Sequence, residues 1–348
     1  MATGGAYKTL GENDIVSTRT LLHEAIPITG SIVSGSAYTD NNIKNHAHGM
    51  FQTVYDYPYL SSSSNHIFDI TFGASSKAAN GNHGNISVQA AKKKNIYNQM
   101  AQVLVGYDIT GSVLDFDVDG NILAGGNKHR DIFIVPFSRL LVKDEIKKGS
   151  FTMKLGTGDA LATPFSVVTT ITDASGSDGY LVNSPAGEYG ILFANGNGAT
   201  NASCGLIYYQ AGICVVTASI FSGLVTGNPI MKGSDTMQTV LRTENIQALA
   251  DSFRHRLQDV TFNNTTELNS TIYFCRAHHN EFNYSTNPTY LSNSKIRVKT
   301  NASDNPVSYI TTIGLYNDNN ELMGVAKLSE PLKKTPDVEF TLRVRLDY

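Results

Sequence analysis

Residues 340–348 form the most regular pattern in the sequence. Apolar or aromatic side chains occupy every second position, and polar or charged side chains lie between them. A side-chain period of two is that of a β-strand with one face on a core and the other in solvent. The pattern predicts a β-sheet covered on one face. The apolar face holds Phe340, Leu342, Val344, Leu346 and Tyr348, and the polar face holds Thr341, Arg343, Arg345 and Asp347.

Short strands separated by turn residues are expected from Tyr107 onward, a spacing typical of a sandwich or barrel. Hairpin turns are predicted at Gln210–Gly212, at Asn317–Asn320 and at Asn263–Glu267. The last of these would join a strand at 257–262 to a strand at 268–276. Further strands are expected at 112–116, 121–124, 131–137, 150–155, 165–172, 190–194, 205–210, 213–218, 309–316 and 321–328.

Helical spacing of apolar residues occurs in three segments. A helix is expected from Ile15 to Ala25, with Asn13 or Asp14 as its N-cap and Pro27 as its stop. A second is predicted over Ile96–Leu104, followed by Gly106 as the C′ residue. A third could begin at a Thr243 cap and run through Ile246 to Phe253.

These patterns predict a mostly β fold: two β-sandwich-like units with a helix-containing, loop-rich N-terminal arm. The predicted divisions are an arm with two helices at 1–106, a first β domain at 107–228, a linker with a possible helix at 229–255 and a second β domain at 256–348. A chain of 348 residues is long enough for two such cores.

The charge pattern argues against nucleic acid as a partner. The formal net charge is −3 at pH 7, and Lys92–Lys94 is the only run of three cations. Phosphate binding needs clustered Lys and Arg side chains. Only 16% of residues are charged, so charge repulsion opposes self-association weakly. We therefore expect a homo-oligomer or a multi-copy subunit.

No membrane span or secretory signal is expected, because no apolar run reaches about 18 residues and the first residues lack the basic and apolar regions of a signal peptide. Cys204, Cys214 and Cys275 are widely spaced in apolar surroundings, which favours buried reduced thiols over a disulfide framework or zinc site. Both features predict synthesis in a reducing cytoplasm.

The segment from Asp115 to Ile122 matches the first half of a calcium-binding loop. Asp115, Asp117 and Asp119 alternate, and Gly120 stands at the sixth position. Gly126, however, occupies the twelfth position, where such loops carry a bidentate Glu. A β-hairpin with a positive-φ turn at Asp119–Gly120 is the favoured alternative. The three aspartates stay a weak calcium candidate, and no metal is favoured.

Other motifs of chemistry are incomplete. His278 and His279, like His46 and His48, lack the helical spacing of a His-Glu-X-X-His metal site. We find no Gly-X-Ser-X-Gly elbow and no complete phosphate-binding loop. The sequence therefore predicts that the protein is not an enzyme and uses no cofactor.

Tyrosines offer a candidate interface. Tyr55, Tyr57 and Tyr59 alternate, so an extended segment would present all three on one side. Tyrosine supplies rigid contact area with a polar tip. The alternative, that they cover the chain's own core, is equally open. They lie in a Ser-, Gly- and Asn-rich segment from about Thr29 to Asn85 that we interpret as an arm that orders against a partner.

The segment Ser308–Leu328, with Thr311-Thr312-Ile313-Gly314-Leu315-Tyr316 and the Asn317–Asn320 turn, resembles virion structural proteins of contractile-tailed bacteriophages, including cyanophage-type myoviruses. Phe137–Phe151 and Glu281–Pro288 look like the same family. The resemblance covers well under half of the chain and implies no catalytic residues.

What the resemblance implies is a multi-copy component of the phage tail, in the baseplate or neck, with other virion structural proteins as partners. Such a protein would be assembled in the host bacterial cytoplasm and remain in the virion. The alternative is a receptor- or carbohydrate-binding β module of a tail fibre or adhesin.

Overall fold

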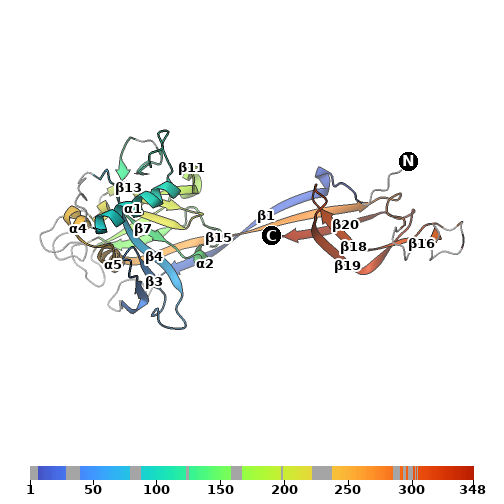
Figure 1. The fold of residues 1–348 in the computed structure, drawn as a ribbon, viewed down its shortest axis with the longest axis horizontal. Coiled ribbons are helices and arrows are strands. Elements are labelled where there is room, and N and C mark those ends of the chain that lie inside the picture. The colour runs from blue at the N-terminus through green and yellow to red at the C-terminus, as the bar shows by residue number, and fades with distance from the viewer. Residues whose placement is uncertain are drawn as a thin grey trace. The chain divides into compact units, whose positions relative to one another are not determined.

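The computed structural model describes residues 7–28, 40–78, 88–122, 125–157, 167–196, 199–221, 237–284, 291–292, 295–296, 301, 303 and 305–348. Over these residues the fold is mostly β, as predicted (Figure 1). The predicted strands at 121–124 and 165–172 and the predicted linker lie partly outside them.

The strands are β1 (Ile15–Ile28), β2 (Ile43–Asn45), β3 (Gln52–Tyr55), β4 (His66–Ala74), β5 (Phe116–Asp117), β6 (Lys128–His129), β7 (Asp131–Pro136), β8 (Glu145–Ile146), β9 (Thr152–Gly156), β10 (Val168–Thr172), β11 (Leu181–Ser184), β12 (Gly187–Gly196), β13 (Ala199–Tyr208), β14 (Ile213–Thr217), β15 (Leu257–Ala277), β16 (Leu291–Ser292), β17 (Lys295–Ile296), β18 (Ser308–Tyr316), β19 (Leu322–Lys334) and β20 (Phe340–Asp347). The helices are α1 (Val88–Leu104), α2 (Arg139–Val142), α3 (Gly176–Gly179), α4 (Met237–Thr243) and α5 (Ile246–Arg256), with 3-10 turns at Glu12–Asp14, Asp40–Asn42 and Ala218–Phe221.

The chain divides into two compact units. Unit 1 comprises Met1–Leu21 and Glu267–Tyr348, and unit 2 comprises Leu22–Thr266. The division falls inside β1 and inside β15. These units differ from the predicted domains, whose boundaries were placed at 106, 228 and 255.

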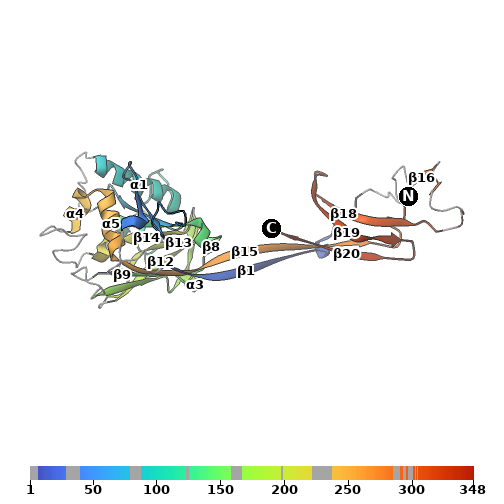
Figure 2. The same ribbon diagram turned by 90° about the horizontal axis from the view of Figure 1, so that it is seen from below.

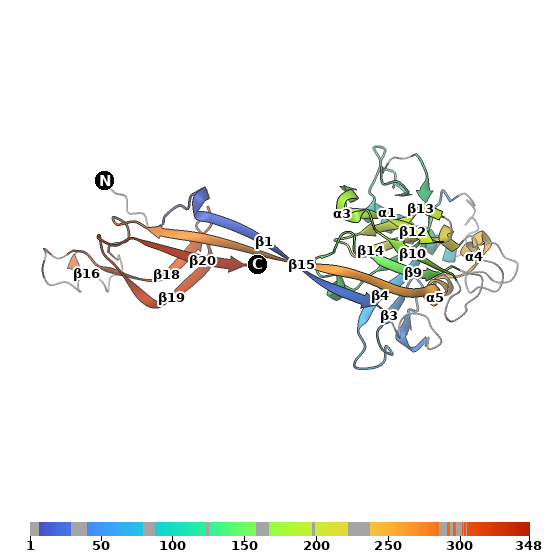
Figure 3. The same cartoon turned by 180° about the vertical axis from the view of Figure 1, so that it is seen from behind.

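Unit 2 is built on a sheet with the order β1-β15-β9-β10-β12-β13-β14-β7-β4-β3-β2. The sheet curls back on itself. This is seen from Phe137, which directly follows β7, because its ring lies 5.2 Å from that of Phe262 in β15. Strands β7 and β15 are far apart in the order of the sheet. Helix α1 crosses β4 and β7 in Figure 1, and β9, β10 and β12 lie on the opposite side in Figure 3.

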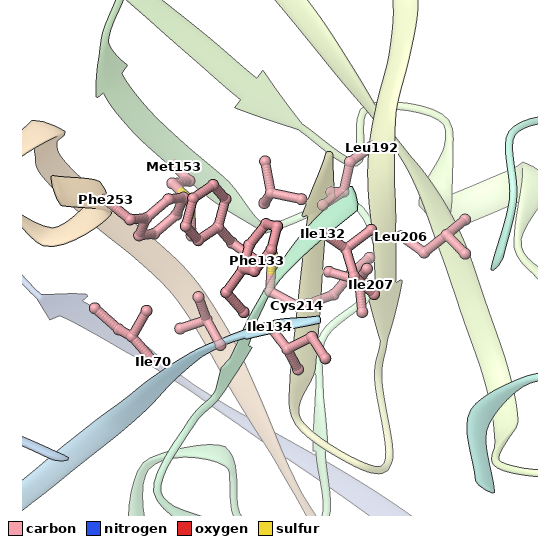
Figure 4. Close-up of a cluster of buried hydrophobic side chains, with 14 of the residues drawn as sticks. Ile70, Ile132, Phe133, Ile134, Met153, Leu192, Leu206, Ile207, Cys214 and Phe253 are labelled. Carbon is pink, nitrogen blue, oxygen red and sulfur yellow. The ribbon is translucent and has the colours of Figure 1, made fainter. Parts of the chain in front are cut away.

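The core of unit 2 lies between these layers. Phe133 is fully buried and stacks on Phe253 of α5 at 4.8 Å between centroids. The two rings point toward one another in Figure 4, with Met153 of β9 close by. Phe72 of β4 and Phe221 contact the same ring of Phe133. One helix, two strands and a 3-10 turn are thus joined through one aromatic side chain.

Helix α1 confirms the second predicted helix. Its buried face carries Ile96, Tyr97 and Leu104, and Gly106 follows with a φ of +95°. Lys93 is also buried, and its Nζ donates to the carbonyls of Leu241 and Glu244, each at 2.6 Å. Leu241 lies in the last turn of α4 and Glu244 directly follows the helix, where backbone carbonyls have no partner within the helix. Burial lowers the pKa of Lys93 to about 8.

The helix predicted over Ile15–Ala25 is wrong: these residues form β1, exposed along almost all its length. The segment is rich in β-branched residues, which favour the extended chain, and its helical spacing of apolar residues is incidental. In the sheet order β1 has β15 as its neighbour and lies at the end.

The hairpin predicted at Asn263–Glu267 is also wrong, because β15 runs through it as one strand of 21 residues. Asn264 explains why no turn forms. Its side-chain amide donates to Leu141 O at 2.9 Å, and its Oδ1 accepts from Glu24 N at 3.2 Å. Thr265 and Asn264 also pair with β8. Asn264 and Thr265 therefore join β15 to neighbouring segments instead of forming a turn.

The predicted loop-rich arm at 1–106 differs from the structure, because much of it belongs to the sheet and core of unit 2. Residues 43–74 form β2, β3 and β4, and Val54, Phe68 and Phe72 enter the core. Strand β4 is buried along most of its length, so it lacks the alternation of a half-exposed strand.

The predicted linker at 229–255 also differs from the structure. Its helix α5 is a core helix, and its N-cap is Asn245 rather than Thr243, with Asn245 Oδ1 accepting from Ala248 N at 2.7 Å.

The central role of Phe133 can be measured. Phe133→Ala removes a fully buried ring that contacts three others, so the free energy of unfolding should fall by about 3–5 kcal/mol. Leu140, which is 75% exposed in the same unit, is the matched control, and Leu140→Ala should change stability by about 0.5 kcal/mol or less. Urea unfolding followed by circular dichroism compares them. Equal effects would contradict the assigned core.

Candidate assembly surface

The Asp115–Ile122 segment lies in a β-hairpin, as the favoured alternative predicted, but the paired strand is Lys128–His129 rather than the predicted strand at 121–124. Strand β5 pairs with β6, and Gly120 has a φ of +77°. Asp117 is buried, lies 3.1 Å from Lys128 Nζ and accepts from Ile122 N at 2.7 Å. Burial raises the pKa of Asp117, but the hydrogen bond and charge of Lys128 outweigh burial, and the net shift is downward.

The other two aspartates also serve the local fold. Asp115 accepts from Ser75 Oγ at 2.8 Å, and Asp119 accepts from the Asn121 side chain at 2.7 Å. Within the described part of the chain, no group of three or more His, Cys, Asp or Glu side chains is placed to hold a metal ion. The geometry gives these carboxylates structural partners.

His129 and Ser203 come together beside this hairpin, with Nε2 and Oγ 3.5 Å apart. The arrangement lacks the geometry of a catalytic triad, because Ser203 Oγ donates to Val118 O at 2.8 Å and Asp117 is bound to Lys128. His129 is 5% exposed, and burial lowers its pKa to about 4. The imidazole is therefore neutral near pH 7 and packs inside unit 2.

The predicted tyrosine interface takes a different form from the one expected. Tyr55 ends β3, and the chain then turns, with Tyr59 N donating to Asn41 O at 3.0 Å. Tyr57 is 58% exposed, whereas Tyr55 is half-buried and its ring lies 6.3 Å from that of Tyr59. The three do not form one extended stripe. Their role as an interface stays a prediction.

The histidines that lack the spacing of a metal site lie in separate units. His46 and His48 stack at 5.1 Å in unit 2, while His279 Nδ1 lies 3.2 Å from Glu339 Oε1 in unit 1. Burial lowers the pKa of His46, and the neighbouring charge of His48 adds to the effect.

Unit 1 contains a surface of another kind, on the β18–β19 hairpin. The turn at Asn317–Asn320 is confirmed: Asn317 N donates to Glu321 O at 3.1 Å, and Asn320 has a φ of +62°. Gly324 faces β20, since a Cβ placed there would lie 3.6 Å from Leu346. Alternation puts Val325 on the opposite, outer side. Figure 2 shows the hairpin lying over β20.

The outer side of the hairpin is apolar. Val325 pairs with Gly314 and is 52% exposed. A Cβ at Gly314 would lie 2.9 Å from the ring of Tyr316 and 3.3 Å from Leu322, so only glycine leaves room for both side chains here. A register shift separates Leu315 from Tyr316. We call the exposed set on this side the hairpin face: Tyr316, Leu322, Met323 and Val325.

Tyr7 extends the hairpin face. Its ring meets that of Tyr316 edge-on, with centroids 5.0 Å apart, and Tyr7 itself is 59% exposed. Met323 is 69% exposed. Aromatic residues and Met are enriched in protein interfaces. The hairpin face therefore has the composition of a contact surface.

The small amount of buried apolar surface distinguishes unit 1 from unit 2. The connected hydrophobic core runs from Ile28 to Phe262 and includes no described residue of unit 1. Among the described residues of unit 1, the buried hydrophobic side chains are Ala277, Val307 and Val344, and each keeps 6–7% of its surface exposed. Its exposed large hydrophobic side chains are Tyr7, Ile15, Val16, Leu21, Leu268, Phe282, Tyr284, Tyr309, Tyr316, Leu322, Met323, Val325, Val338 and Tyr348.

Polar contacts hold unit 1 together instead. Lys334 is fully buried, and its Nζ donates to Asn283 Oδ1 at 2.8 Å and to Thr335 O at 2.9 Å. Burial lowers the pKa of Lys334. Between β15 and β20, the Asn269 and Tyr348 backbones exchange two hydrogen bonds. Hydrogen bonds fix the strands but remove little apolar surface from water.

No protein-family model, no curated protein and no solved structure matches the chain. Among the described residues, no helix has both the length and the apolar character needed to cross a bilayer.

Sequence reasoning missed the hairpin face, although it predicted the hairpin. The overlooked signal lies in β18 and β19, which carry apolar residues on both sides: Ile313 and Leu315 inward, Tyr316 and Val325 outward. A strand that is apolar on both faces needs a packed layer against each face. In the described part of the chain, β20 packs against the inner face of the hairpin.

The neutral, buried His129 predicts a stability that declines in acid. Its pKa is about 4 in the fold and 6.5 when unperturbed, so between these values the unfolded chain binds a proton that the folded chain does not. The free energy of unfolding should therefore fall by about 3 kcal/mol as pH is lowered through this window. The pKa of Asp117 is lowered in the fold, so protonation of this carboxylate should reduce the free energy of unfolding further at still lower pH.

Urea unfolding at a series of pH values measures this slope. His129→Gln should flatten it between pH 6.5 and 4, whereas Leu140→Ala, at an exposed position of the same unit that carries no titratable group, should leave it unchanged. A wild-type slope that survives His129→Gln would contradict the assignment.

The aspartate loop predicts weak or no calcium binding. Isothermal titration should show no binding tighter than roughly the millimolar range of weak extracellular calcium modules. Tighter binding that is lost in Asp119→Asn would contradict the structural role given to these carboxylates.

Proposed function

We propose that this protein is a non-enzymatic structural subunit that is built in several copies into a larger assembly. One observation carries the proposal: unit 1 exposes the apolar side chains from which a second core layer could be made. Exposed apolar patches on folded proteins mark interaction surfaces. A covering protein would bury the hairpin face and complete the sandwich-like arrangement.

The physical need for a cover follows from how β layers are stabilised. A β-hairpin is marginal in water unless it packs against further strands or another layer. Ile313, Leu315 and Leu346 on the inner side of unit 1 are only half-buried. Burying Tyr316, Leu322 and Val325 against another chain would stabilise the hairpin and join the two molecules in one step.

We propose further that the assembly is the virion of a contractile-tailed bacteriophage, with the subunit in the baseplate or neck. The support is the resemblance of Ser308–Leu328, which spans β18, the Asn317–Asn320 turn and much of β19. The resembling segment thus contains the whole hairpin face. Its partners would be other virion structural proteins and further copies of this chain.

A receptor- or carbohydrate-binding module is the second candidate, favoured by the exposed tyrosine rings of unit 1. Tyr284 and Tyr309 are 60% and 54% exposed. Aromatic rings can stack on sugars as well as on protein side chains. A glycan array distinguishes the two candidates: selective glycan binding that Tyr309→Ala abolishes would support the module and count against a purely structural role.

Self-association should depend on the hairpin face. The double variant Met323→Glu/Val325→Glu places charges on two exposed positions of unit 1, so it should leave unit 2 folded and weaken association through the hairpin face by roughly 30-fold or more. Sedimentation velocity over a range of concentrations is the measurement, with circular dichroism to confirm folding.

Leu60→Glu is the matched control, because Leu60 is 84% exposed in unit 2 and lies outside the hairpin face. This control should sediment like the wild type. A wild-type chain that stays monomeric at about millimolar concentration, or a double variant that forms the same oligomers as the wild type, would refute self-association through the hairpin face.

A further inference from the structure

Strand β20 of unit 1 has one paired side and one unpaired side. It pairs with β15 over Phe340–Asp347, and the two strands lie alongside each other in Figure 3. Among the described residues, no strand pairs with β20 on its other side. An unpaired strand edge presents backbone N–H and C=O groups, and the chemistry that binds them is the backbone of another extended strand.

The backbone hydrogen bonds show which residues face the unpaired side. Asn269 N donates to Tyr348 O at 3.1 Å, and Tyr348 N donates to Asn269 O at 2.8 Å. Tyr348 therefore directs both of its backbone groups toward β15. Because these groups alternate in direction along an antiparallel strand, those of every second residue point to the unpaired side. These residues are Thr341, Arg343, Arg345 and Asp347, and all are exposed.

A strand added at this edge must match both faces of β20. Leu346 lies on the face that packs toward Gly324 of the hairpin, and the charged side chains lie on the opposite face. The added strand therefore needs apolar residues on the hairpin side and polar residues on the other side, in strict alternation. Among the described strands of unit 1 that are longer than two residues, only β20 itself alternates in this way.

Charge complementarity selects a second β20, in antiparallel orientation, as the occupant. Residues whose backbone groups face the edge must lie opposite each other in the two strands. A two-fold axis at Arg345 places Arg343 of each copy opposite Asp347 of the other, which gives two ion pairs across the interface. The two Arg345 side chains meet at the axis, where each keeps its own Asp347 at 2.7 Å. An axis at Val344 would instead oppose Arg343 and Arg345, which repel each other.

The same register pairs apolar side chains on the hairpin side. Val344 lies opposite Leu346 of the other copy, and Leu342 lies opposite Tyr348. Pairing from Leu342 to Tyr348 extends over roughly 23 Å and closes about six backbone hydrogen bonds. Strand addition obtains its affinity from these main-chain bonds rather than from a large apolar area. We therefore expect a weak dimer that is strengthened when further contacts hold the copies together.

We propose that unit 1 binds a second copy of this chain edge to edge, by antiparallel pairing of β20 with β20 about a two-fold axis at Arg345. The sheet that contains β15 and β20 then continues into the second copy. The proposal deepens the proposed function by naming one contact between copies, and it rests on that function only in that several copies assemble. It uses the edge of β20 and not the hairpin face.

Charge reversal tests the register. Arg343→Asp and Asp347→Arg each place like charges opposite one another in both ion pairs, so either variant alone should dimerise roughly 10-fold more weakly than the wild type in sedimentation velocity. An equimolar mixture of the two variants should recover the dimer, because each ion pair then joins an arginine to an aspartate. This recovery would also show that both variants are folded.

Lys333→Asp is the matched control, because it makes the same change in net charge as Arg343→Asp at an exposed position of β19. This control should dimerise like the wild type.

Disulfide formation tests the position of the axis. Cys275→Ser removes the partly exposed native thiol, while Cys204 and Cys214 are buried. In this background, Arg345→Cys should cross-link two chains under mild oxidation, because directly paired residues lie within the reach of a disulfide. Thr341→Cys, on the same exposed face, should not, because the two introduced thiols would lie far apart on either side of the axis.

Two results would overturn the proposal. One is a wild-type chain that stays monomeric at about millimolar concentration. The other is a dimer that both charge reversals leave unchanged and that Arg345→Cys does not cross-link.

The edge and the hairpin face can be separated, because the β20 variants leave Met323 and Val325 in place. Association that is lost in Met323→Glu/Val325→Glu but kept in Arg343→Asp would refute edge pairing and leave the hairpin face standing. Association that is weakened in Arg343→Asp, recovered in the mixture and unaffected by Met323→Glu/Val325→Glu would support edge pairing and refute self-association through the hairpin face.

Discussion

The uneven burial of apolar side chains is the constraint on which the rest of this structure depends. In unit 2 the sheet curls until Phe137 meets Phe262, and Phe133 joins β4, α5 and the 3-10 turn through ring contacts. Such contacts remove much apolar surface from water, which is the main favourable contribution to folding. In unit 1 the described strands are paired, yet their apolar side chains stay largely exposed.

This difference gives the two units different relations to other molecules. Unit 2 has a connected hydrophobic core of its own. Unit 1 is fixed by backbone pairing and by polar contacts such as those of Lys334, which specify geometry without supplying much hydrophobic stabilisation. A partner that covers Tyr316 and Val325 would contribute what unit 1 lacks. Folding of unit 1 and assembly are then coupled.

The sequence predicted those features that depend on local pattern. The alternation of Phe340–Asp347 predicted β20, and the turn residues Asn317–Asn320 predicted the β18–β19 hairpin. Helix α1 was predicted from the spacing of Ile96 and Leu104 because one face of it is buried. In each case the signal and the structure lie within the same short segment.

Features that depend on distant partners could not be predicted in this way. Asn264 looks like a turn residue, but it contacts Leu141 and Glu24 from within the continuous strand β15. Strand β4 is buried on both faces and so has no alternation to detect. For the candidate site, the sequence placed the interface at Tyr55, Tyr57 and Tyr59, because it shows which residues are aromatic but not which apolar faces the fold leaves uncovered.

Hydrogen exchange measured as a function of protein concentration tests the central claim most directly. If unit 1 is completed by another copy of the chain, amide protection in Ser308–Tyr316 and Leu322–Lys334 should be low in dilute solution and rise with concentration, while protection in β7 and β14 stays constant. Protection in the hairpin as high as that in β7 at the lowest concentration would contradict the account, because unit 1 would then be stable without a partner.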